Sequence, residues 1–159
     1  MGKVLSNFTN GFAGAIARSV DDIVIAMANR GESPIAFGKP VALNEDKDGV
    51  VPFDGSTHTA ADFVGVTVRN PSKTPDAYGA NTGSYAAGEM VDVLVRGHIV
   101  VKLAGSDPMI GDAVSIQKTT GGFAVGSGDS YVAIPTLRLT AAPDADGMAE
   151  ILLTTRNIL

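Results

Sequence analysis

The sequence predicts an all-β protein, a single jelly-roll or barrel-like β-sandwich with an extended N-terminal arm. Short segments that alternate apolar and polar residues recur along the chain, which is the periodicity of half-buried strands. The chain contains 19 glycines, and many of them separate these segments as turns. Its 159 residues suit one domain with a sizeable core.

About ten short strands are expected, at the spacing typical of a sandwich or barrel. In residues 64–69 the alternation places three valines on one face, and in residues 98–104 it directs Ile99, Val101 and Leu103 inward. Gly97 predicts a tight turn or a bulge within a long bent strand, and Pro135 predicts an edge or a kink. The expected strands are 22–28, 35–43, 49–53, 63–69, 90–96, 98–104, 112–117, 122–125, 131–140 and 148–155.

The turn at residues 44–49 has a second interpretation. Its sequence, Asn-Glu-Asp-Lys-Asp-Gly, matches the first half of a calcium loop, in which oxygens at alternate positions converge on the ion. Gly55 stands where that loop needs a bidentate glutamate, and the flanking residues are typical of strands. A polar hairpin turn is therefore favoured, with a weak cation site as the alternative.

The N-terminal segment, residues 1–20, contains no acidic residue in a chain of net charge −5. Its apolar residues fall at spacings of three to four, which is compatible with a short amphipathic helix packed on its own domain. Gly11 and Gly14 weaken a helix, so an extended arm that docks on a neighbour is favoured instead. The β-sandwich or barrel domain is then expected to comprise residues 21–159. The arm residues expected to make contact are Phe8, Phe12, Ile16 and Arg18.

A long loop is predicted at residues 70–88. It contains two prolines, several glycines and no clear periodicity, and loops of this length are usually functional or mobile. Tyr78 and Tyr85 favour a contact surface, because tyrosine rings bury area while their hydroxyls remain hydrogen-bonded. A mobile surface loop is the alternative.

No catalytic, cofactor or metal site is expected. The chain has no cysteine, and its two histidines, His58 and His98, lack the spacing of paired ligands. Gly128-Asp-Ser lacks the Gly-x-Ser-x-Gly elbow of a serine hydrolase. The acidic charge balance disfavours nucleic acid as a partner, and no stretch reaches the roughly 20 apolar residues of a membrane span.

The order of glycines and apolar positions resembles the cement, or decoration, proteins of tailed bacteriophage capsids. The resemblance covers nearly the whole chain as a pattern rather than as one rare motif. It rests on Gly11-Phe-Ala-Gly-Ala-Ile-Ala-Arg18, Ile35-Ala-Phe-Gly-Lys-Pro-Val41, Phe63-Val-Gly-Val66, Tyr85-Ala-Ala-Gly-Glu-Met-Val-Asp-Val-Leu-Val-Arg-Gly97, Ile110-Gly-Asp-Ala-Val114 and Gly147-Met-Ala-Glu-Ile-Leu-Leu153.

This resemblance implies a structural virion protein that binds the outer surface of a phage capsid and cements neighbouring major capsid subunits. It implies a β-barrel or jelly roll without an active site, made in the bacterial host cytoplasm. A homodimer or homotrimer at a symmetry axis is expected. The alternatives are another virion component, such as a tail or baseplate adaptor or a head-fibre base, and a carbohydrate-binding β-barrel module. The absence of tryptophan weakens the last of these.

Overall fold

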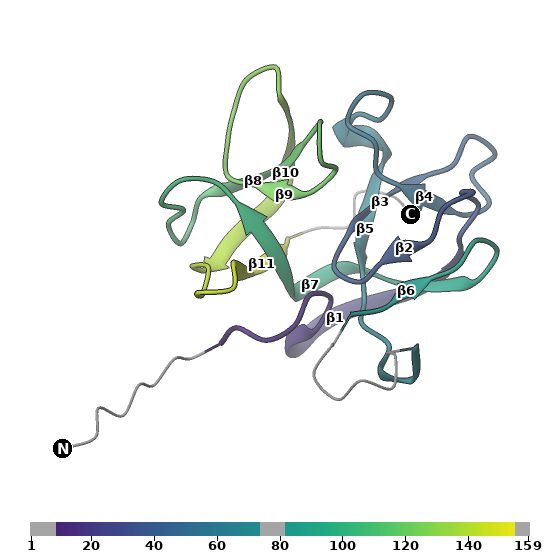
Figure 1. The fold of residues 1–159 in the computed structure, drawn as a ribbon, viewed down its shortest axis with the longest axis horizontal. Coiled ribbons are helices and arrows are strands. Elements are labelled where there is room, and N and C mark those ends of the chain that lie inside the picture. Colours follow the sequence, from purple (N-terminus) through teal and green to yellow (C-terminus); the bar gives the residue numbers. More distant parts are fainter. Residues whose placement is uncertain (1–8, 74–81, 155–159) are drawn as a thin grey trace.

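A computed structural model describes residues 9–73 and 82–154, and the predicted all-β class is confirmed (Figure 1). Only two single-turn 3-10 helices, η1 (Ala60–Asp62) and η2 (Pro71–Lys73), interrupt the strands of this part of the chain. None of its helices is long and apolar enough to cross a membrane. The strands are β1 (Ile16–Ala28), β2 (Ile35–Ala36), β3 (Pro40–Leu43), β4 (Val50–Pro52), β5 (Phe63–Thr67), β6 (Ser84–Tyr85), β7 (Met90–Ala104), β8 (Ala113–Gln117), β9 (Phe123–Ala124), β10 (Tyr131–Ala141) and β11 (Met148–Leu153).

Five strands close into a barrel. β7 pairs with β11 on one side and with β9 on the other, and β8 and β10 complete the ring. The barrel residues that alternate inward form the larger core, in which the side chains of all five strands meet. Its fully buried members include Ile99, Val101, Val114, Ile116, Leu137, Leu139, Ile151 and Leu153.

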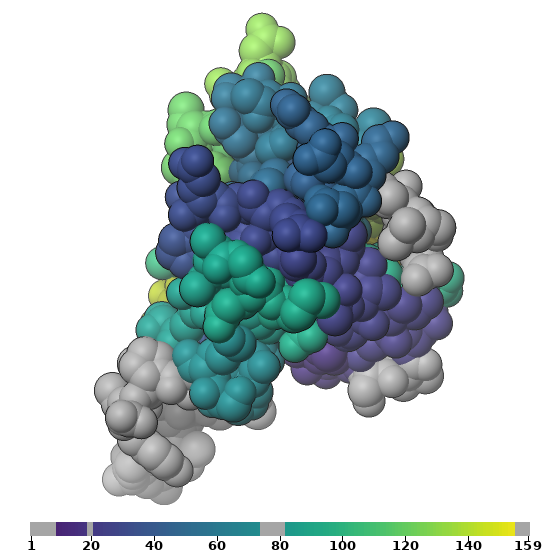
Figure 2. All heavy atoms as spheres, turned by 90° about the vertical axis from the view of Figure 1, so that its right-hand side faces the viewer, coloured from purple at the N-terminus to yellow at the C-terminus, as the bar shows by residue number. Residues whose placement is uncertain are grey.

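The same sheet continues on the N-terminal half of β7, and we call this continuation the second sheet. Here β7 pairs with β1 on one side and with β5 on the other, and β3 and β4 follow β5. This sheet curls until Asn29, just after β1, meets Val50 of β4 in a parallel bridge. It encloses a second core, to which β2 and β6 contribute Ile35 and Tyr85. In Figure 2 the purple atoms of β1 lie at the surface of this half, beside the teal atoms that lead into β7.

β7 bends at Gly97, where the inward direction of its side chains changes parity. Leu94 points into the larger core before the bend, whereas Ile99, Val101 and Leu103 do so after it. Side chains alternate between the two faces of a regular strand, so Leu94 and Ile99 would point to opposite faces. Because both point into the larger core, the backbone between them must be irregular. The tight turn predicted at Gly97 is wrong, because β7 runs unbroken from Met90 to Ala104. The extra residues of the irregularity lie on β1, where Arg18 to Ile23 spans only His98 to Arg96 of β7, and Gly97 itself has a φ of 120°.

The predicted alternation in residues 64–69 is wrong. Val64 lies in the second core and Val66 in the larger one, and every residue of β5 is buried. The register of β5 against β3 shifts next to Gly65, which turns the two valines to opposite faces. β5 lies between two cores, so even its polar residue Thr67 is buried, with its hydroxyl donating to the Ala36 carbonyl at 2.7 Å.

Other boundaries differ in smaller ways. The predicted strand 35–43 divides into β2 and β3 at Gly38, whose φ of 69° breaks the extended backbone. A short strand, β6, forms inside the predicted 70–88 loop by pairing with β2. Pro135 lies within β10, where the register against β8 breaks between Ala133 and Arg138, so the kink prediction is confirmed.

The predicted boundary between arm and domain, at residues 20 and 21, lies inside β1. This strand begins at Ile16, and its first residue already pairs with Ile99 of β7. Between Asn10 and β1 the chain is not helical but makes a turn, in which the Ala15 N–H donates to the Phe12 carbonyl at 2.9 Å. It packs on its own domain because backbone groups of β7 provide hydrogen-bond partners there. Residues 1–8 lie outside the described part of the chain.

Gly97 provides a test of this architecture. A Cβ atom at this position would collide with Oδ1 of Asp22 and lie 3.0 Å from the Asp22 Cα, and the φ of Gly97 is +120°. We expect Gly97→Ala to lower the free energy of unfolding by about 3 kcal/mol or more, because backbone strain and overpacking add. Urea unfolding measures this change.

The matched control is Gly88→Ala. Gly88 also has a positive φ, +81°, but no atom lies within 4 Å of the added Cβ. Only the backbone cost of about 1 kcal/mol is then expected. If the two variants lost the same free energy of unfolding, that result would contradict the close approach of β1 to Gly97 of β7.

Candidate functional site

The N-terminal segment Asn10–Ala15 forms a strap across the body of the protein, and Asn10 fixes its first end. The Asn10 side-chain amide donates to the carbonyl oxygens of Ala142 (2.8 Å) and Met148 (2.6 Å). Its backbone N–H donates to the Asp144 carboxylate at 2.8 Å. Three hydrogen bonds therefore hold this end of the strap against the turn between β10 and β11.

Gly14 fixes the strap where the two halves of the protein meet. Its N–H donates to the carbonyl of Val100, and its own carbonyl accepts from the N–H of Arg69, both at 2.8 Å. A Cβ on Gly14 would lie 2.8 Å from the Arg69 nitrogen and 2.9 Å from the nitrogen of Gly38. Only glycine permits so close a passage, and it also tolerates the φ of +80° found here.

Three of the predicted contact residues are exposed on this strap and at the start of β1. Phe12 is 49% exposed and Ile16 is 39% exposed, which is high for large apolar side chains. The Arg69 guanidinium lies 5.5 Å from the centroid of the Phe12 ring. Arg18 is also exposed, and its Nε is 2.9 Å from Oε1 of the nearly buried Glu150. The strap is thus rigidly held while its apolar side chains remain open to solvent.

The predicted tyrosine contacts have a different outcome. Tyr85 is 1% exposed, and its hydroxyl donates to the carbonyl of Val68 at 2.7 Å. Burial, followed by the negative charge of Asp92, raises the pKa of Tyr85 to about 12. Tyr85 is therefore a residue of the second core and is removed from the candidate contact surface. Tyr78 and Phe8 lie outside the described residues.

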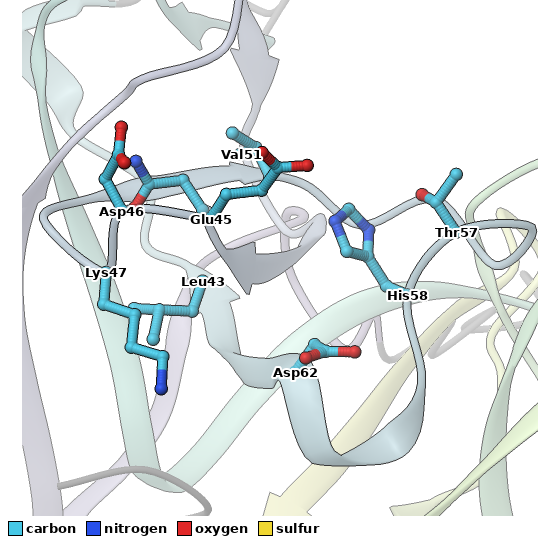
Figure 3. A pocket seen from close by; sticks show the side chains of 9 residues that line it. Leu43, Glu45, Asp46, Lys47, Val51, Thr57, His58 and Asp62 are labelled. Atoms are coloured by element: carbon cyan, nitrogen blue, oxygen red, sulfur yellow. The ribbon is translucent and has the colours of Figure 1, made fainter.

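A cavity of about 740 Å³ opens beside the β3–β4 turn (Figure 3). Its polar side chains stabilise the adjoining loops. Nδ1 of His58 accepts from the Asp54 N–H at 2.9 Å. Asp62 accepts from the Thr59 N–H and hydroxyl, and these two hydrogen bonds lower the pKa of Asp62. The lining residues are Leu43, Asn44, Glu45, Asp46, Lys47, Val51, Thr57, His58 and Asp62.

The cation alternative for residues 44–49 gains no support from this geometry. Oδ1 of Asn44 accepts from the N–H groups of Asp48 and Gly49, both at 3.0 Å, which closes the hairpin turn between β3 and β4. The side chains of Asp46 and Lys47 point away from His58 (Figure 3). Among the described residues, no group of three histidine, aspartate or glutamate side chains could hold a metal ion.

Sequence reasoning missed the two residues that position the strap, Asn10 and Asp144. The Asp144 carboxylate accepts a hydrogen bond from Asn10, which lies 134 residues away in the chain. The sequence contains no signal for a contact of that separation. The indications of a functional N-terminal segment were its lack of acidic residues and the spacing of its apolar residues.

The chain was compared with known proteins. It matches the family described as "Structural cement protein (E217 gp24/Pam3 gp6)" over residues 2–154. Among solved structures it is similar to a chain from "The capsid of Myoviridae Phage XM1", with a TM-score of 0.75 and 16% sequence identity. That match covers 96% of this chain and 95% of the phage XM1 chain, and at this identity it shows a shared fold. No curated protein matches the sequence significantly.

The strap should be pH-sensitive through Asp144. Partial burial disfavours its charge, but hydrogen bonds from the N–H groups of Asn10, Met148 and Asp146 outweigh that effect and lower its pKa. A carboxyl group with a lowered pKa stabilises the folded state above its ordinary pKa of about 3.9. This stabilisation disappears as the pH falls through the lowered value.

We therefore expect Asp144→Asn to reduce the free energy of unfolding at neutral pH, and the difference from the unsubstituted protein to shrink in acid. Urea unfolding as a function of pH measures it, and the amide resonance of Asn10 should titrate with the same midpoint. The control is Asp129→Asn, which changes an exposed aspartate outside the strap. A difference for Asp144→Asn that stays constant down to about pH 2 would contradict the role of its carboxylate.

Proposed function

The chain belongs to the family of phage structural cement proteins, and from that premise we propose that it binds the outer surface of a capsid and bridges neighbouring major capsid subunits. It is a capsid-binding structural protein of the virion. The observation that carries the proposal is the family match over residues 2–154, together with a fold shared with a capsid-derived chain.

The architecture suits a protein that transmits force between subunits. The barrel and the second sheet share one strand, β7, whose 15 residues run through both. A load on either half therefore acts on continuous hydrogen-bonded ladders rather than on a linker. The larger core also includes Ala42 of β3 with Phe63 and Val66 of β5, so it packs across both halves and disfavours hinge motion between them.

The strap is the contact surface that we favour. Phe12 and Ile16 are apolar anchors on a backbone that is already ordered, so little conformational entropy is lost when a partner covers them. Large aromatic and aliphatic side chains of this kind dominate the binding energy of many interfaces. Arg18 lies beside them and offers a partially exposed guanidinium to a carboxylate or carbonyl of the capsid.

A bridging role also requires contact with more than one neighbour. We propose that residues 1–8, which precede the strap, reach a second capsid subunit, and that the protein acts as a homodimer or homotrimer at a symmetry axis. The paucity of charge supports extensive protein contact: charged residues make up 18% of the chain, against about 25% in average soluble domains.

Cryo-electron microscopy of the parent virion tests the location. Density that fits the barrel and second sheet is expected on the outer surface, in contact with at least two major capsid subunits. Density confined to the tail or baseplate would identify an adaptor instead, and absence from the particle would overturn the proposal.

The strap itself is tested by the double variant Phe12→Ser/Ile16→Ser. Both side chains are exposed in the free protein, so thermal stability should change little, whereas affinity for empty capsid shells should fall at least about tenfold. Co-sedimentation with shells measures the affinity. Val24→Ser, an equally exposed apolar position on β1, is the matched control and should bind like the unsubstituted protein. Full binding by the double variant would exclude the strap as a contact surface.

A further inference from the structure

The loop between β7 and β8 presents an apolar tip that the strap hypothesis does not explain. Met109 is 69% exposed and Ile110 is 70% exposed, the highest values among the large apolar side chains that are exposed in the described residues. A single exposed aliphatic residue is ordinary on a protein surface. Two consecutive ones at the end of a projecting loop form a contiguous apolar surface, and such surfaces mark interaction sites.

This tip is held in one conformation before any partner binds. The Met109 N–H donates to the Asp112 carboxylate at 2.8 Å, and the Asp112 N–H donates back to the Met109 carbonyl at 3.1 Å. The loop is also tied to β10, because the N–H of Gly111 donates to the Leu139 carbonyl and the N–H of Leu139 donates to the Asp112 carbonyl. An ordered loop loses little entropy on binding, so the apolar side chains contribute most of their burial energy to affinity.

Acidic side chains outnumber basic ones around the tip. The basic ones are Lys102, exposed near the end of β7, and Arg138, exposed on β10 opposite Ala113. Residues 104–117 contain Asp107 and Asp112 but no lysine or arginine. The β10–β11 turn, residues 142–147, lies on the same side of the barrel (Figure 1) and contains Asp144 and Asp146, again without a basic residue. Two copies that met tip to tip would bring these carboxylates together, which is unfavourable. The charges instead favour a partner whose apolar depression is bordered by basic side chains.

The tip and the strap also lie on a common side of the molecule. Asn10 is hydrogen-bonded to the β10–β11 turn, and this turn lies beside the β7–β8 loop in Figure 1. A surface that engaged the start of the strap would therefore approach the tip as well. Two contacts made by one rigid body reinforce each other, since the second is formed at a high effective concentration.

We infer that Met109 and Ile110 insert into an apolar depression, bordered by lysine or arginine side chains, on the outer surface of the capsid shell. This assignment rests on the proposed capsid-binding function and adds a second anchor to the strap. The occupant is the capsid rather than a second copy of the chain, because the acidic rim disfavours the symmetric self-contact.

The experiment compares the unsubstituted protein, Met109→Ser/Ile110→Ser and Met90→Ser in binding to empty capsid shells. Met90 is 57% exposed and lies at the start of β7, so Met90→Ser controls for the loss of an exposed apolar side chain elsewhere. The double variant should bind at least about tenfold more weakly, and Met90→Ser should bind normally. Binding of the unsubstituted protein should also weaken at high salt, which screens the acidic rim.

Each outcome is decisive. If the unsubstituted protein does not bind shells, the proposed function is overturned and the tip assignment with it. If the unsubstituted protein and Met90→Ser bind and the double variant binds equally well, only the tip assignment is overturned. If the double variant loses self-association but keeps its affinity for shells, the tip contacts another copy, which also overturns the assignment.

A second measurement does not depend on the folding of the double variant. The chain has no cysteine, so Ile110→Cys introduces a unique thiol that can carry a photoreactive maleimide crosslinker. Irradiation of the labelled protein on shells should yield a covalent adduct with the major capsid protein. Adducts formed only between copies of the chain would contradict the assignment.

Discussion

The structure depends on a single strand, β7, and on the irregular backbone at Gly97, whose φ is 120°. Before Gly97 its valines face the second core, and after it the alternate residues face the barrel. One strand can serve two cores because this irregularity changes which residues point inward. Opposite it β1 carries the extra residues, and Asp22 comes so close to Gly97 that a Cβ atom would prevent the approach. Loss of this close approach would disturb the pairing of β1 with β7, the strand that connects the two halves.

The candidate functional surface is built on this rigid frame rather than in a cavity. Several side chains that line the cavity beside the β3–β4 turn form hydrogen bonds that close the neighbouring turns. Four of the six exposed large apolar side chains of the described residues instead lie on the strap, at the start of β1 and on the β7–β8 loop, which hydrogen bonds tie to the barrel. A rigid body with ordered apolar projections suits a protein that joins subunits, since it loses little entropy on binding and yields little under load.

The fold class and most strands could be predicted from the sequence, because period-two alternation and glycine turns are local signals. Nine of the ten predicted segments correspond to single strands or parts of the long strand β7, and the tenth, 35–43, contains two. The valines of residues 64–69 show where this approach fails. Alternation assumes one buried face, whereas β5 is buried on both. The prediction that Tyr85 is a contact residue is wrong for a related reason. Composition does not distinguish a tyrosine of a surface loop from one that completes a core.

The sequence by itself determined the β-rich architecture, the membership implied by its glycine pattern and the apolar, acid-free character of the N-terminal segment. These properties are local or compositional, so no knowledge of distant contacts is needed to recognise them. Only the tertiary structure decided that residues 10–18 belong to the body of the protein, and that Asn10 binds a turn 134 residues away. It also decided that Met109 and Ile110 project from an ordered loop. Such features depend on which strands become neighbours when the barrel closes, and the sequence does not encode that proximity in any single segment.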